Sequence, residues 1–116
     1  IAATVVMDEL PDYPKQACEI YQNRRDKLVD GLNRIGWEIA KPKATMFVWA
    51  KIPDAYREMS SLEFAKFCVT ECNVAVSPGS GFGPGGEEFV RFALVENDQR
   101  TSQAIRNLKK GLTKLE

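Results

Sequence analysis

The chain has 116 residues, of which 44% are hydrophobic, and its 16 basic and 16 acidic side chains cancel to a formal net charge of zero. This length and composition fit one globular domain with a single core, without a net field that draws it to nucleic acid or an anionic membrane. Histidine is absent, which excludes Ser-His and Cys-His nucleophile pairs. Because no apolar run approaches the roughly 20 residues that span a bilayer and no signal-peptide pattern opens the sequence, we expect a cytoplasmic protein.

The N-terminal region predicts a short apolar stub followed by a long helix. Residues 1–7 are mostly apolar and residues 8–13 are polar with a proline, so residues 1–13 are interpreted as a stub and hinge left from a preceding domain. The lack of an initiator methionine fits a fragment of a longer protein. A helix is expected from about Pro14 to Ile35, with Gly36 as its stop and Arg24 and Arg25 interrupting its apolar stripe.

The middle of the chain predicts two strands and a capped helix. Strands are expected over 37–40 and 46–52, with Pro53 ending the second. Ser60 and Glu63 have the spacing of a capping box, which predicts a helix to about Cys72 with Asn73 as its end. We expect its buried side to comprise Phe64, Ala65, Cys68, Val69 and Cys72. The three cysteines form no Cys-X-X-Cys pair, and Cys68 and Cys72, four residues apart on this helix, are expected to be reduced core thiols in place of redox or metal-binding residues.

The last third predicts two more strands, over 74–76 and 89–95, and a final helix from Asn97 or Asp98 with Ile105, Leu108, Leu112 and Leu115 on one side. The predicted order is α-β-β-α-β-β-α. This pattern indicates the α+β class, in which helices cover a small, mostly antiparallel sheet.

A glycine-rich turn over residues 77–86 runs directly into the last predicted strand, which carries Arg91. Strand alternation puts Val90, Phe92 and Leu94 on one face and Arg91 on the other. A guanidinium held in mid-strand beside a turn with few side chains is suited to bind a carboxylate through two parallel hydrogen bonds. The alternative is a surface arginine paired with Glu87 or Glu88.

Nucleotide and RNA sites are poor interpretations of the same turn. Residues 81–86 fit the pattern Gly-X-Gly-X-X-Gly, but a strand follows Gly86 where a dinucleotide site requires a helix. The Lys-Ser/Thr of a P-loop and the downstream motifs of a kinase are absent. The sequence between Phe82 and Phe89 breaks the contiguous aromatic motif of an RNA-recognition module, and the net charge is zero.

Three segments resemble the C-terminal small domain of class I/II pyridoxal-phosphate-dependent aminotransferases of fold type I. They are Arg24-Arg25-Asp26 through Gly36-Trp37, Pro42-Lys43-Ala44-Thr45-Met46-Phe47-Val48-Trp49, and Pro78-Gly79-Ser80-Gly81-Phe82-Gly83 with Val90-Arg91-Phe92-Ala93-Leu94. The residues of the second segment are more similar to the alanine/aspartate branch of that family. The resemblance covers residues 14–116 as the small domain. It implies that Arg91 binds the substrate α-carboxylate, and that Met46 and Phe47 are candidates to shape the pocket. Glycine stands in many relatives where this chain has Ala44 or Thr45.

The resemblance also implies what this chain lacks. The family's Schiff-base lysine and its pyridoxal 5'-phosphate-binding residues belong to the large domain, and no lysine here lies in a matching motif. We therefore expect no catalytic, cofactor-binding or metal-binding residue in this chain, and no activity from it alone. The implied parent is a homodimer that transfers an amino group between an amino acid and a 2-oxo acid. The alternatives are another fold-type-I reaction, or an effector or amino-acid-binding domain of a non-enzymatic regulator.

Overall fold

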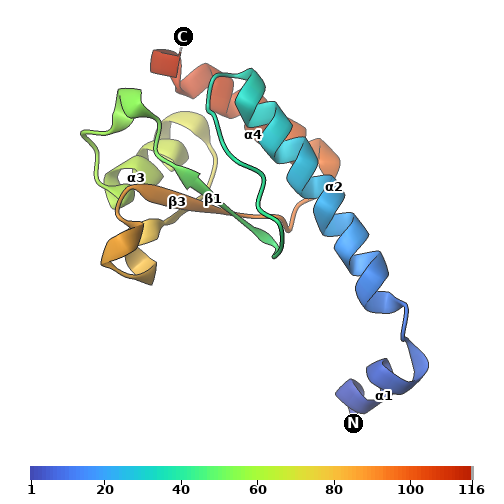
Figure 1. Cartoon of the computed structure of the whole chain (residues 1–116). Coiled ribbons are helices and arrows are strands. Elements are labelled where there is room, and N and C mark those ends of the chain that lie inside the picture. Colours follow the sequence, from blue (N-terminus) through green and yellow to red (C-terminus); the bar gives the residue numbers. More distant parts are fainter. Residues whose placement is uncertain (116) are drawn as a thin grey trace.

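The long helix α2 (Tyr13–Arg34) is the spine of the molecule, as shown in Figure 1. In the computed structural model of the chain, which describes residues 1–115, Pro14 occupies its first turn, where a missing N–H costs nothing. Only its C-terminal half is buried, through Leu28, Val29, Gly31 and Leu32. Gly36 follows with φ 96°, a left-handed value suited to glycine at a helix end.

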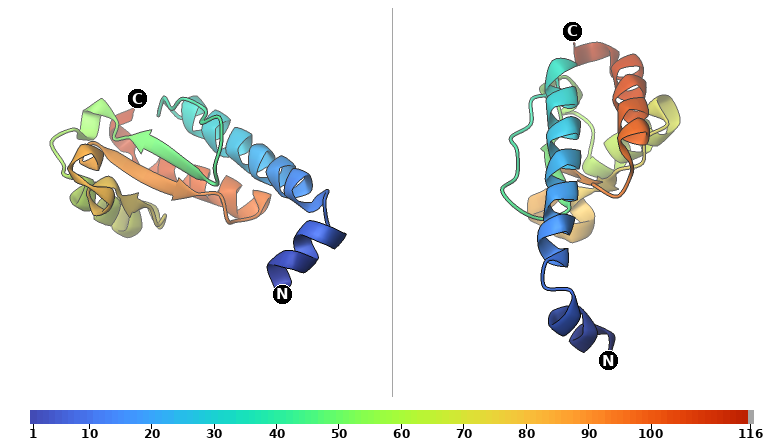
Figure 2. Two further views of the ribbon diagram at one scale, coloured as in Figure 1. Left: turned by 60° about the horizontal axis from the view of Figure 1, so that its bottom comes forward. Right: turned by 90° about the vertical axis from the view of Figure 1, so that its right-hand side faces the viewer.

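Two further helices complete the helical part of the fold. Helix α3 (Ser61–Cys72) begins with the predicted capping box between Ser60 and Glu63 and ends at Asn73, whose φ is 53°. Helix α4 (Asp98–Gly111) begins with Asn97, whose side chain accepts a hydrogen bond from the Arg100 N–H. Helix α4 packs against both α2 and α3, and Figure 2 shows α2 and α4 side by side.

A three-stranded antiparallel sheet completes the fold, with the order β1 (Phe47–Lys51), β3 (Phe89–Ala93), β2 (Ser77–Pro78). Val90 and Phe92 of the central strand are buried, whereas Phe89, Arg91 and Ala93 alternate with them on the other face. This alternation confirms the predicted orientation of the strand. One face of the sheet therefore belongs to the core, and the other is open.

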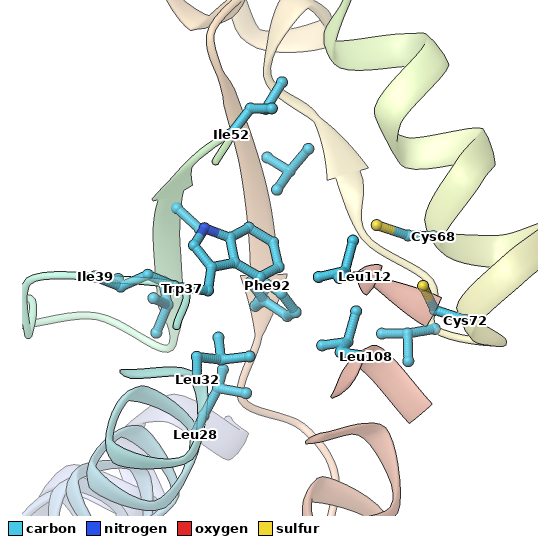
Figure 3. Close-up of a cluster of buried hydrophobic side chains, with 14 of the residues drawn as sticks. Leu28, Leu32, Trp37, Ile39, Ile52, Cys68, Cys72, Phe92, Leu108 and Leu112 are labelled. Atoms are coloured by element: carbon cyan, nitrogen blue, oxygen red, sulfur yellow. The ribbon is translucent and has the colours of Figure 1, made fainter. Parts of the chain in front are cut away.

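Trp37 lies in the centre of the core, 1% exposed, between the sheet and the helices (Figure 3). Its ring meets Phe64 of α3 and Phe92 of β3 edge-on, with centroids 5.6 and 5.5 Å away. Its indole N–H donates to the Lys51 carbonyl at 2.8 Å, so the one polar atom of this buried side chain has a hydrogen-bond partner. One aromatic side chain thus links the helices to β1 and β3.

The α+β class is confirmed, but the predicted elements differ from the structure at three places. Residues 37–40 form no strand, because Trp37 enters the core and the Ile39 N–H bonds to the Asn33 side chain at 2.7 Å. The strand expected over 74–76 begins at Ser77, because the Val74 N–H is still bonded to the Cys68 carbonyl. The apolar stub is a helix, α1 (Ala2–Glu9).

Two predictions about burial and helix length also need correction. Val69, placed on the buried side of α3, is 50% exposed. The last helix ends at Gly111, and Leu115 lies in a separate 3-10 turn, Thr113–Leu115. Among residues 1–115, no helix combines the length and apolar character needed to cross a membrane.

Candidate functional site

Arg91 lies in the middle of the central strand, on the open face of the sheet. In the strand register it stands opposite Trp49 of β1 on one side and Ser77 of β2 on the other. Its neighbours along the chain, Val90 and Phe92, are anchored in the core, which fixes the backbone from which the side chain projects. The sheet thus presents one guanidinium at a defined position on an otherwise open surface.

The guanidinium lies between two aromatic rings. Its central carbon Cζ is 3.9 Å from the centroid of Phe47, which begins β1, and 4.1 Å from the centroid of Phe82, which belongs to the glycine-rich turn. Both distances are well inside the roughly 6 Å over which a cation and a ring face attract each other. The Phe82 ring also meets Trp49 edge-on at 5.5 Å. The cation is therefore enclosed by side chains from separate elements.

Arg91 has no carboxylate partner among the described residues. None of the ion pairs within residues 1–115 includes it, and its Nε is buried without a hydrogen-bond acceptor. Glu87 accepts a hydrogen bond from the Ser61 N–H at 2.9 Å, and Glu88 faces Lys51 at 4.0 Å. The alternative in which Arg91 pairs with Glu87 or Glu88 is therefore wrong in this structure. A positive charge without an internal partner remains on the open face.

The glycine-rich turn that carries Phe82 is two consecutive 3-10 turns, Gly79–Phe82 and Pro84–Gly86. Its ends cross so closely that a Cβ on Gly79 would collide with the carbonyl oxygens of Gly86 and Phe89. The turn is also tied to α3, since the Ser80 N–H donates to the buried Ser61 hydroxyl at 3.1 Å. Gly79 and Gly86 are therefore required by close backbone approach, and the turn holds Phe82 in place.

An apolar hollow of about 380 Å³ adjoins Arg91 on the same face. It is lined by Trp49, Phe82, Gly83, Gly85, Gly86 and Phe89. Trp49 and Phe82 are 42% and 51% exposed, which is unusual for large aromatic side chains in a small domain. The open face therefore combines one cation with exposed aromatic surface.

The segment before β1 is held by the arginines of α2. Arg25 donates to the Pro42 carbonyl at 3.0 Å and pairs with Asp26 at 2.8 Å, an interaction that lowers the pKa of the Asp26 carboxyl below its ordinary value. Arg24 donates to the Leu94 carbonyl, beyond the end of β3, at 2.9 Å. Both arginines thus make internal contacts that fix the chain on either side of the sheet.

Thr45, directly before β1, has φ 77°. This left-handed value is strained for a β-branched residue and costs of order 1–3 kcal/mol. Met46 follows, and its carbonyl accepts from the Leu94 N–H at 2.8 Å, so the strained turn feeds directly into the sheet. Of the two residues named as candidates to shape a pocket, Phe47 contacts the Arg91 guanidinium, whereas Met46 joins β1 to the chain beyond β3.

The sequence predicts Arg91 and Phe47 as site residues. Phe82 and Trp49 appear there only within the segments of the resemblance, without a role of their own. The missed signal was the period of two in β1, which puts Phe47, Trp49 and Lys51 on the same face as Arg91 once the strands pair. The hydrogen bond from the Ser80 N–H to the Ser61 hydroxyl corresponds to no recognisable sequence pattern.

Comparison with known proteins gives a consistent result. The family model for aminotransferase class I and II matches residues 1–108. The chain is 50% identical over 109 residues to the glutamate-pyruvate aminotransferase AlaC of Escherichia coli strain K12, which covers 94% of this chain and 26% of that protein. It is 41% identical over 97 residues to an LL-diaminopimelate aminotransferase of Moorella thermoacetica, covering 84% of this chain and 24% of that protein.

Solved structures show the same fold. The substrate-bound structure of BacF from Bacillus subtilis matches with a TM-score of 0.88 at 28% identity, over 94% of this chain and 28% of that one. An aminotransferase from Staphylococcus aureus matches with a TM-score of 0.84 at 27% identity, over 93% and 28% of the two chains. The chain therefore spans about a quarter of the length of the curated relatives it matches.

Proposed function

The chain belongs to the aminotransferase class I and II family, and on this premise we propose that it is the C-terminal small domain of an amino acid:2-oxo acid aminotransferase. In this proposal residues 14–116 form the small domain, and residues 1–13 are the end of the preceding domain and the hinge. Arg91 binds the α-carboxylate of the substrate. The preferred reaction is of the alanine type, because the relative that is 50% identical is named for glutamate and pyruvate.

The observation that carries the proposal is the guanidinium of Arg91, which lies on the open face without an internal carboxylate. Both substrates of amino transfer carry a carboxylate next to the reacting carbon. One planar guanidinium that binds this group through two hydrogen bonds therefore serves the amino acid and the 2-oxo acid alike. Holding the carboxylate also orients the reacting carbon, which lowers the entropic part of the barrier.

The cofactor of the proposed parent is pyridoxal 5'-phosphate, but the residues of this chain do not form its cradle. Lys51, the lysine on the open face, lies 4.0 Å from Glu88, and the glycine-rich turn leads into a strand where a phosphate site needs a helix N-terminus. We assign the cofactor's binding groups to the rest of the parent. This chain contributes the substrate carboxylate contact.

The test is Arg91→Lys in the full-length protein, with steady-state kinetics for L-alanine, L-glutamate and their 2-oxo acids. Lysine keeps the charge but lacks the planar pair of donors, so KM for every carboxylate substrate is expected to rise about tenfold to a hundredfold, with lower kcat. Arg106→Lys, at an exposed position on α4, is the matched control and is expected to change neither constant.

Unchanged kinetics for Arg91→Lys would remove Arg91 from the site. A wild-type protein that binds amino acids but transfers no amino group would replace the aminotransferase assignment with a regulator or another reaction type. Formation of the 2-oxo acid from one of the donors, dependent on Arg91, supports both the reaction and the residue.

A further inference from the structure

We infer that Phe82 and Phe47 are positioning residues: they clamp the Arg91 guanidinium between their rings, so that it offers a substrate carboxylate only its terminal edge. The inference rests on the proposed function, because it assumes that Arg91 binds a carboxylate. It adds two residues and a binding geometry.

The clamp follows from two short contacts on one planar group. The Cζ atom of Arg91 lies 3.9 Å from the Phe47 centroid and 4.1 Å from the Phe82 centroid. An arginine side chain on an open sheet face has many rotamers, and fixing one of them costs side-chain entropy. Because two rings already enclose the guanidinium, this entropy is lost when the chain folds and not when the substrate binds. The preorganised side chain therefore binds more tightly than a mobile one.

Burial of Nε decides which edge of the guanidinium meets the ligand. Nε is inaccessible and has no acceptor among the described residues. The rings cover the region above and below the central carbon. A carboxylate that forms two parallel hydrogen bonds must therefore approach the two terminal nitrogens, Nη1 and Nη2, end-on. This approach fixes the plane of the carboxylate as well as its position.

Phe82 is better explained by this role than by core packing. Its side chain is 51% exposed, so its burial contributes little to folding. It is nevertheless held by a costly arrangement, the close crossing of Gly79 and Gly86 and the bond from the Ser80 N–H to the buried Ser61 hydroxyl. A turn built this tightly around an exposed aromatic residue fits a need to place the ring accurately over Arg91.

The test compares Phe82→Leu with Phe82→Tyr in the full-length protein. Leucine keeps most of the apolar bulk but has no ring face, whereas tyrosine keeps the face. For Phe82→Leu we expect KM for L-alanine and pyruvate to rise about tenfold, and for Phe82→Tyr a change within about twofold. Phe67→Leu is the matched control, because Phe67 lies on α3, packs against Tyr56 and Phe64 and does not line the hollow. It is expected to leave KM unchanged.

A second substrate separates positioning from a general structural effect. Ethylamine is alanine without its carboxylate, and its reaction with the holoenzyme can be followed by the visible absorption of the cofactor. Phe82→Leu is expected to leave the apparent dissociation constant for ethylamine unchanged while weakening L-alanine. Equal weakening of both ligands, or of neither, would overturn the clamp.

Arg91→Lys in the same assays separates the two proposals. Weaker carboxylate binding by Arg91→Lys with wild-type behaviour of Phe82→Leu would overturn the clamp and leave the proposed function standing. No effect of Arg91→Lys would overturn both. In the double variant, the penalty of Phe82→Leu is expected to shrink to within about twofold, because no planar guanidinium remains to be held.

Discussion

At the scale of single residues, the buried thiols give the chain a pH-dependent stability. Burial, and to a lesser extent the neighbouring Cys72, raises the pKa of the Cys68 thiol to about 12 from an ordinary value of 9.0. The unfolded chain therefore loses this proton near pH 9, while the folded chain keeps it to about pH 12. Stability from this group is complete below pH 9 and declines as pH rises, at a limiting slope of about 1.4 kcal/mol per pH unit.

The measurement is chemical unfolding of the chain between roughly pH 8 and 10.5, a range that covers the onset of the decline, with Cys68→Ala as the variant. Removal of the thiol is expected to flatten the alkaline decline in the free energy of unfolding, whatever its effect on the absolute value. Cys18→Ala, at an exposed cysteine, is the matched control and should keep the wild-type slope. If the free energy of unfolding declined with the same slope in wild type and Cys68→Ala, burial would not be what keeps the Cys68 thiol protonated.

The candidate site shows how far single residues can be predicted from the sequence. Alternation along 89–95 was enough to place Arg91 on the open face, because the period of two is a local property of a strand. Its enclosure by Phe47 and Phe82 depends on strand pairing and on how the glycine-rich turn folds, and neither is a local property. The absence of an ion pair with Glu87 has a similar cause, since that carboxylate is used by the Ser61 N–H of α3.

At the scale of elements, the glycine-rich turn contains two glycines that differ in whether they tolerate a Cβ atom. A Cβ on Gly79 collides with two backbone carbonyls, whereas a Cβ on Gly81 meets nothing within 4 Å. Backbone cannot move aside as a side-chain tip can, so Gly79→Ala is expected to destabilise the chain by about 2–4 kcal/mol. Gly81→Ala should stay within about 0.5 kcal/mol of wild type.

Denaturant unfolding of both variants checks this difference, and the full-length protein adds a functional readout. If the turn positions Phe82, Gly79→Ala also raises KM for L-alanine under conditions where the protein remains folded. Equal stability of the two alanine variants would contradict the close crossing of Gly79 and Gly86.

Elements with local start and stop signals were predicted well. The capping box of Ser60 and Glu63 and the left-handed Asn73 define α3 to within one residue, because the bonds that cap a helix come from its own neighbours. The segment 37–40 is wrongly predicted as a strand, because alternating apolar residues indicate that side chains are buried but not that the backbone pairs with another strand. Trp37 and Ile39 are indeed buried, but their backbone bonds to Leu32 and Asn33 of α2.

At the scale of the whole molecule, large apolar side chains are exposed on and directly after helix α1, namely Val5, Val6, Met7 and Leu10. Helix α1 has no buried residue, and in Figure 1 it lies apart from the body, at the N-terminal end of α2. Ala3, Val6 and Met7 of this helix, with Leu10 directly after it, form an apolar stripe at positions i, i+3, i+4 and i+7. An amphipathic helix without a partner is marginal in water, so this stripe is suited to another part of the proposed parent.

Glutamate substitutions on opposite sides of α1 test whether another part of the parent covers the apolar stripe. Val6 lies in the apolar stripe, and Thr4, two residues away and so about 200° around the helix, lies on the polar side. In the 116-residue chain both Val6→Glu and Thr4→Glu are expected to change the free energy of unfolding by less than about 0.5 kcal/mol, because α1 touches no core there.

In the full-length protein Val6→Glu is expected to cost about 2 kcal/mol or more, since it places a charge where a buried valine contributes about 1.5–3 kcal/mol, while Thr4→Glu remains near wild type. Thermal unfolding of the four proteins against their parents measures the difference. A silent Val6→Glu in the full-length protein would mean that α1 stays in water, and residues 1–13 would then not belong to a preceding domain. A loss of stability of equal size in the 116-residue chain would mean that α1 folds back onto the body. Destabilisation confined to the longer protein requires a covering segment outside this chain, which is what a small domain joined through α1 to a large one must have.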